Sequence, residues 1–106
     1  MLEDLLRTPL PVIGVVHLPP LPGSVANAAD AEACLAVALA DGRCYAAAGV
    51  DALLLENHGD APFPKDRIEP HVTALLGLAA RSLRTEIGLP IGVNCLRNDA
   101  LAALAV

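Results

Sequence analysis

The sequence predicts an α/β fold made of repeated strand–helix units. Three short apolar segments, at 12–18, 51–56 and 90–95, are rich in Val, Ile or Leu and are bounded by Gly or Pro. None of them alternates between apolar and polar residues, which is typical of strands buried on both faces of a parallel sheet. The segments begin about 39 residues apart, and an Ile-Gly-Val triplet occurs in the first and the third. This repeat predicts a β-α-β-α-β-α order with parallel strands and right-handed crossovers.

The first helix is predicted between the first two strands, over about 31–48. Asp30 fits the N-cap position, and Gly49 fits the position after the helix where a left-handed residue ends it. The predicted apolar side follows helical spacing: Leu35, Leu39, and Tyr45 or Ala46.

The second helix is predicted before the third strand, over about 70–87. Pro70 suits the first turn, because the N–H that proline lacks would have no partner there. Gly88 supplies a left-handed cap, and Pro90 prevents the helix from continuing. Five residues form its apolar stripe: Val72, Leu75, Leu76, Ala79 and Leu83.

A third helix is predicted to begin near Asn98 and Asp99, after the third strand. Asn98 fits the N-cap, and the Asp99 carboxylate in the first turn complements the positive end of the helix dipole. The apolar residues that follow run to Val106 without a stop signal. We therefore expect a chain that is truncated after its third strand.

Two folds are built from such units, a (β/α)8 TIM barrel and a doubly wound sheet. Three units are fewer than either fold requires, so residues 1–106 are expected to be the N-terminal portion of one TIM-barrel domain. A half-size doubly wound domain is the alternative. A mean hydropathy of +0.54 is high for a chain of this size. It predicts apolar surface that is covered by the missing C-terminal part of the barrel or by self-association.

The composition favours a folded protein that neither binds nucleic acid nor spans a membrane. With 55% hydrophobic residues the chain is not disordered, and its longest unbroken apolar run, 33–40, is far too short to span a bilayer. The net charge is −5, and the 7 basic residues are scattered, which argues against a nucleic-acid partner. The acidic start lacks the basic region of a signal peptide, so we expect a cytoplasmic protein.

Three cysteines, Cys34, Cys44 and Cys95, are predicted to be reduced thiols. Their number is odd, and no two of them have the CxxC spacing. We expect each of them to act as a small buried hydrophobic residue.

The candidate site lies at the carboxyl ends of the strands, where βα folds bind their ligands. His17, Glu56 and Asn94 stand at these ends and are the candidate catalytic residues. Neighbouring parallel strands lie about 4.8 Å apart, so these side chains, with Arg97, are expected to reach one shared volume. Aligning the two Ile-Gly-Val triplets places Cys95 rather than Asn94 opposite His17. We nevertheless expect Asn94 to face inward, because an amide suits a wet barrel mouth.

Three further residues are candidate ligand-binding groups: Asn57, Asp60 and Arg97. The structural alternative for Asp60 is an Asx turn after Gly59. For Arg97, which suits an anion or a carboxylate, the alternative is an ion pair with a neighbouring acid. For His17 it is a buried hydrogen bond to a neighbouring strand end.

Metal and cofactor signals are weak in this sequence. Glu56, His58 and Asp60 have the chemistry of metal ligands, but their spacing matches no zinc signature, so no metal is predicted. The short motifs of nucleotide-binding folds and of common hydrolases are absent, which leaves the cofactor unknown.

Three long blocks, at 13–24, 49–63 and 90–100, resemble the BtpA/SgcQ family in sequence and in order. The resemblance covers essentially the whole chain and implies a TIM barrel of about eight βα units, related to the phosphate-binding barrels. The usual phosphate site of such barrels follows strands 7 and 8, beyond the three units found here. Many relatives are expected to carry an aromatic residue where this chain has His58.

The resemblance also implies two kinds of function. One branch of the family is linked to photosystem I accumulation as a peripheral thylakoid protein, and another lies among bacterial sugar-metabolism genes. We therefore expect a barrel protein that binds or acts on a small phosphorylated or sugar-like metabolite. The alternatives are a non-catalytic assembly factor for a membrane complex, held at the cytoplasmic side of the membrane, and an inactive truncated product. No catalytic set transfers from the family, so the question of an enzyme stays open.

Overall fold

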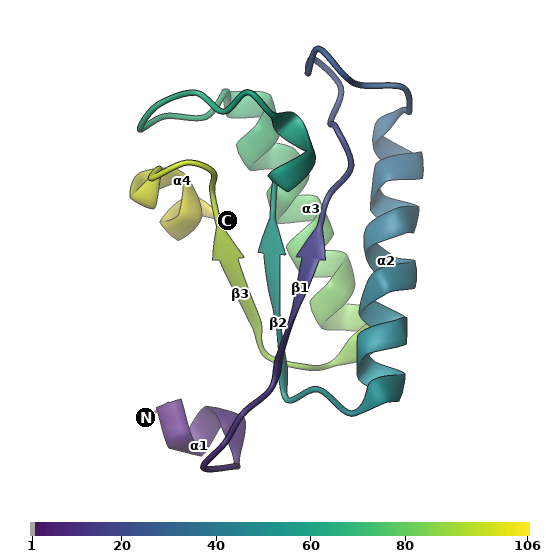
Figure 1. Ribbon diagram of the computed structural model, residues 1–106, viewed down its shortest axis with the longest axis vertical. Helices are drawn as coiled ribbons and strands as arrows, with labels where there is room; N and C mark the ends of the chain where they lie inside the picture. The colour runs from purple at the N-terminus through teal and green to yellow at the C-terminus, as the bar shows by residue number, and fades with distance from the viewer. Residues whose placement is uncertain (1) are drawn as a thin grey trace.

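The computed structural model describes residues 2–106, with side chains from Asp4 onward. Helices and strands alternate along the chain (Figure 1). They are α1 (Leu2–Leu6), β1 (Ile13–His17), α2 (Ala31–Ala48), β2 (Ala52–Glu56), α3 (Pro70–Ile87), β3 (Ile91–Asn94) and α4 (Ala100–Ala105), with a 3₁₀ turn, η1 (His58–Asp60), after β2. The predicted β-α-β-α-β-α order is confirmed, and α1 and η1 are the elements that the apolar pattern did not predict.

The strands form one parallel sheet in the order β1-β2-β3. In the first pair His17 lies opposite Glu56, and in the second pair Glu56 lies opposite Asn94. The three strand ends are therefore level with one another. The loops that leave them gather at one end of the sheet, whereas α1 lies at the other end (Figure 1).

One face of the sheet is covered by helices and contains the hydrophobic core. Val16 and Leu55 are fully buried there, and Leu76 and Leu83 of α3 pack into the same cluster. Because side chains alternate between the faces of a strand, this burial at every second residue shows that the helices lie on one side. A doubly wound domain needs helices on both faces, so the arrangement is consistent with part of a (β/α)8 barrel.

The opposite face of the sheet is apolar but only partly covered. Val15 and Leu54 are half-buried, and Ile13 keeps 49% of its surface exposed. In a closed barrel this face would line the interior. The sequence predicted strands buried on both faces, whereas among the described residues the full burial is concentrated on the helix-covered face of β1 and β2.

Helix α2 approaches α3 closely at a glycine. A Cβ atom at Gly42 would lie 2.5 Å from Ile87 Cδ1 and 2.6 Å from Leu83 Cδ2. The buried line of α2 is Cys34, Ala38 and Gly42, and Leu35 is only partly buried beside it. The predicted apolar side does pack against the core, since Leu39 and Tyr45 are partly buried there with Leu35. The tightest contact, however, is made by the small residues beside it.

The predicted helix ends are mostly confirmed. The Asp30 side chain accepts a hydrogen bond from Ala33 N, and Gly49 and Gly88 end their helices with positive φ angles of 87° and 79°. The expected cap at Asn98 is wrong. Asp99 is the N-cap of α4, and its carboxylate accepts from Ala102 N at 2.9 Å.

The cysteines differ in their environment. Cys34 and Cys95 are buried as expected, but Cys44 is exposed on α2, which corrects that prediction. Its helix presents Cys44 to solvent because the buried line of α2 runs through Ala38 and Gly42 instead. Among the described residues, no helix combines the length and apolarity needed to cross a membrane.

Candidate functional site

Three polar side chains meet at the level ends of the strands. His17 Nε2 lies 3.4 Å from Glu56 Oε2, and Asn94 Nδ2 donates a hydrogen bond of 2.8 Å to Glu56 Oε1. The parallel register places all three residues on the partly covered face of the sheet, and this confirms the expected direction of Asn94. Glu56 is thus held between two neighbours, one for each carboxylate oxygen.

Solvent reaches this group from one side. The His17 side chain is 52% exposed, whereas that of Glu56 is 16% exposed. A carboxylate that is partly shielded and already hydrogen-bonded is restricted in orientation, and the imidazole beside it remains open to a ligand. Such a pair suits hydrogen bonding to a polar ligand and, with a suitable substrate, proton transfer.

His58 adds a second imidazole to this group. It begins the η1 turn, and its ring stacks on that of His17 with centroids 4.5 Å apart and planes at 23°. The ring of Phe63 is tilted by 48° to that of His58, with centroids 6.2 Å apart. The ligand atoms of His17, Glu56 and His58 all lie within 4.8 Å of one another.

The loops after β1 and β2 are joined through their backbones. Leu18 N donates to Glu56 O at 2.9 Å, and Gly59 N donates to Leu18 O at 3.0 Å. A Cβ atom at Gly59 would lie 2.5 Å from the backbone of Pro19. Only glycine allows this close approach, so Gly59 holds the η1 turn, and with it His58, against the end of β1.

Asn57 faces the other way. Its side chain is buried, donates to Leu96 O at 3.0 Å and accepts from Leu96 N at 2.6 Å. Both ends of the amide are therefore used to join the loop after β2 to the loop after β3. This geometry gives Asn57 a structural role, and a ligand contact stays an untested prediction.

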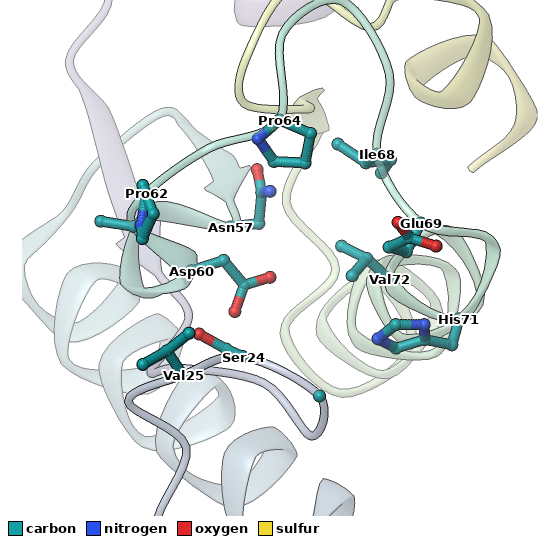
Figure 2. A pocket seen from close by; sticks show the side chains of 12 residues that line it. Ser24, Val25, Asn57, Asp60, Pro62, Pro64, Ile68, Glu69, His71 and Val72 are labelled. Atoms are coloured by element: carbon teal, nitrogen blue, oxygen red, sulfur yellow. The ribbon is translucent and has the colours of Figure 1, made fainter.

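Asp60 joins the first two exit loops and borders a separate cavity. Its Oδ1 accepts from Leu21 N at 2.7 Å. The cavity has a volume of about 150 Å³ and lies between these loops and the start of α3. Figure 2 shows the Asp60 carboxylate pointing into it, with Glu69 and His71 on the opposite side. His71, to which sequence reasoning gave no role, thus lines a cavity outside the strand-end group.

Arg97 does not join the strand-end group. It is exposed, and within residues 4–106 its side chain makes no hydrogen bond or ion pair with His17, Glu56 or Asn94. Its backbone carbonyl accepts from Asp66 N at 3.1 Å. The expectation that four side chains share one volume therefore holds for three of them.

The buried cysteines are poor nucleophiles. Burial raises the pKa of the Cys34 thiol, and the nearby carboxylates of Asp30 and Asp60 raise it further. Burial also raises the pKa of the Cys95 thiol, with a smaller effect from Asp99. Both groups are protonated thiols at neutral pH, and a reactive cysteine needs the opposite shift.

Sequence reasoning missed the place of His58 in the strand-end group. The sequence placed it near Glu56 and Asp60 along the chain but gave it no link to His17, and its side chain is exposed. The signal that brings it to His17 is Gly59, whose backbone packs against the preceding loop. That contact spans two loops distant in sequence and leaves no local pattern.

Comparisons with known proteins assign the chain to a family. The model of the BtpA family matches residues 8–106. An uncharacterised protein of Thermococcus kodakarensis is 45% identical over 96 residues, which are 91% of this chain and 36% of that protein. The photosystem I biogenesis protein BtpA of Synechocystis is 44% identical over 100 residues, which are 94% of this chain and 35% of that protein. An uncharacterised mitochondrial protein of Caenorhabditis elegans is 30% identical over 84 residues, which are 78% of this chain and 30% of that protein.

No solved structure matches the chain. The chain spans between 30% and 40% of the length of the curated relatives that it matches. Because the family match extends over residues 8–106, which is nearly all of the sequence, this protein belongs to the BtpA family.

Proposed function

We propose that the strand ends of this chain form one wall of a binding site for a small, hydroxyl-rich metabolite of the sugar type. The observation that carries this proposal is the meeting of His17, Glu56 and Asn94 on one face of the sheet. A carboxylate that accepts from two hydroxyl groups, flanked by an amide and an imidazole, is well suited to a sugar ring. Fold alone does not assign this function.

A phosphate group on the metabolite would bind elsewhere. Glu56 carries a negative charge that disfavours a phosphate beside it, and Arg97, the candidate anion-binding residue, stands outside the group. We therefore assign the sugar hydroxyls to Glu56 and Asn94. Chemistry on that metabolite would use His17 as the proton carrier, with Glu56 orienting its ring.

The proposal is tested by titrating the chain with a panel of sugars and sugar phosphates while its NMR chemical shifts are recorded. We expect saturable shifts at His17, Glu56 and Asn94. Glu56→Gln should weaken binding by about tenfold or more, since a hydrogen bond to a charged group contributes about 1.5–3 kcal/mol. Glu69→Gln is the matched control, because Glu69 borders the cavity beside α3 instead. Binding that responds to Glu69→Gln and ignores Glu56→Gln would place the ligand in that cavity and contradict the proposal.

The second candidate function is assembly of a membrane complex, with the protein at the cytoplasmic surface of the membrane. It is favoured by the exposed apolar start of β1, where Val12 and Ile13 keep 60% and 49% of their surface exposed, and by the name of the Synechocystis relative. Sedimentation with photosystem-containing membranes tests it. We expect Ile13→Lys to abolish co-sedimentation, and a parent chain that stays in the supernatant would exclude this function.

A further inference from the structure

We infer that His17, Glu56 and His58 form a binding site for a divalent transition-metal ion, with zinc as its best fit. Two imidazole nitrogens and one carboxylate oxygen lie within 4.8 Å of one another at the ends of β1 and β2 and in the η1 turn. Two histidines and one glutamate are a ligand set that catalytic zinc sites use, with water or substrate in the fourth position. Imidazole ligands favour zinc and its neighbours over magnesium or calcium.

The distances suit such an ion. With metal–ligand bonds of about 2.0–2.1 Å, two ligand atoms of a tetrahedral zinc ion lie about 3.3 Å apart. His17 Nε2 and Glu56 Oε2 are 3.4 Å apart, so these two groups already have the required separation. The His58 nitrogen lies within 4.8 Å of the other two ligand atoms, and coordination would require its exposed side chain to rotate closer.

The surroundings orient the carboxylate for this role. Asn94 Nδ2 holds Glu56 Oε1, which leaves Oε2 directed at His17. Metal-bound carboxylates commonly receive such a hydrogen bond from a second side chain, and it fixes their direction. The 52% exposure of the His17 side chain leaves a path for the ion and room for a fourth ligand.

The same three side chains also make contacts without an ion, namely a histidine stack and a His–Glu pair. Metal titration separates the two interpretations, because only a metal site takes up one ion per chain. A metal ion would replace an ordinary His–Glu contact and convert the strand ends into a Lewis-acid centre. This inference shares His17 and Glu56 with the proposed metabolite site, and with an ion bound His17 would be a metal ligand instead of a proton carrier. Metal binding is measured without any metabolite.

The experiment is a titration of the chelator-treated chain with Zn²⁺ by calorimetry and with Co²⁺ by visible absorption. It is carried out in a Cys44→Ser background, because the exposed Cys44 thiol is itself a metal ligand. We expect one ion per chain and Co²⁺ bands typical of four ligands. His58→Ala and Glu56→Gln should each lower the affinity at least tenfold, by analogy with the losses that follow from weaker changes around metal sites.

His71→Ala is the matched control, because it removes the one histidine that lies outside the group. It should leave the affinity unchanged, and circular dichroism should show that all variants keep the fold of the parent. The inference is overturned if the parent chain binds no ion, or if His58→Ala and Glu56→Gln bind as tightly as the parent. A parent chain that binds sugars but no metal ion would overturn the metal site alone and leave the proposed function standing.

Discussion

Glu56 and Asn57 are neighbours in sequence and have opposite surroundings. Glu56 points to the partly covered face of the sheet, where its partners are the side chains of His17 and Asn94. Asn57 points to the covered side, where its partners are the two backbone groups of Leu96. Successive side chains along a strand point to opposite faces. The two polar neighbours are therefore separated, so that Glu56 meets solvent and Asn57 joins loops. Position along the strand, more than residue type, separates side chains at the open face from those that join loops here.

The largest loss of stability is expected when one of two neighbouring leucines of β2, which point to opposite faces of the sheet, is truncated. Leu55 is fully buried against the helices, and Leu54 is half-buried on the other face. Leu55→Ala should lower the free energy of unfolding by about 2–5 kcal/mol. Leu54→Ala should cost clearly less, because part of its surface already meets water. Urea denaturation of both variants measures the difference, and equal losses would contradict the assignment of the two faces.

The next effect concerns the two asparagines. Asn57→Ala leaves the N–H and C=O of Leu96 without their side-chain partner, and should destabilise the protein by about 1–3 kcal/mol. Asn94→Ala should cost less, about 0.5–1.5 kcal/mol, because it loses one hydrogen bond to Glu56 at the more open face. Thermal unfolding followed by circular dichroism compares them. A more damaging Asn94→Ala would show that the strand-end group is the structural one.

A smaller effect concerns acid sensitivity at α4. Hydrogen bonds from Ala102 N and Ile68 N hold the pKa of the Asp99 carboxyl below its usual range. Because the folded-state pKa lies below the unfolded one, Asp99 stabilises the fold above the unfolded pKa, near 3.9. This contribution is lost as the pH falls through the lower folded-state value.

Asp99→Asn should remove this part of the pH dependence. Unfolding free energies measured between neutral pH and pH 3 check this prediction, with Asp41→Asn on the exposed surface of α2 as the control. A parent and an Asp99→Asn variant with parallel profiles would show that Asp99 does not contribute.

The smallest effect leaves stability unchanged and concerns thiol chemistry. Cys44 is exposed, whereas burial raises the pKa of Cys34 and of Cys95. We expect one thiol to react quickly with a soluble disulfide reagent and two to react only after unfolding. Absorbance stopped-flow counts the fast phase, and Cys44→Ser should abolish it. A second fast thiol in the parent would mean that the core opens around Cys34 or Cys95.

The sequence predicted the repeat and both long helices, because each rests on local signals. The helix ends are set by residues within the same turn, namely Pro70, Gly49 and Gly88. The apolar segments predict the strands directly. The register suggested by the two Ile-Gly-Val triplets was wrong, since Asn94 and not Cys95 lies level with His17. The cap at Asn98 was assigned wrongly because Asn98 and Asp99 are both good caps, and the hydrogen bond from Ile68 N that engages Asp99 comes from a distant loop. The joining of His58 to His17 likewise depends on contact between two loops, which no single stretch of sequence encodes.

Tyr45 gives the molecule a built-in optical probe. The chain has one tyrosine and no tryptophan, so its ultraviolet emission comes from this residue without a stronger emitter to mask it. The ring of Tyr45 occupies the space that a side chain at Gly14 would need, and its hydroxyl donates to Val15 O at 3.0 Å. Emission therefore reports whether α2 is docked on β1. Because the ring lies on the covered side of the sheet, its emission monitors the helix-covered core and not the side chains at the strand ends.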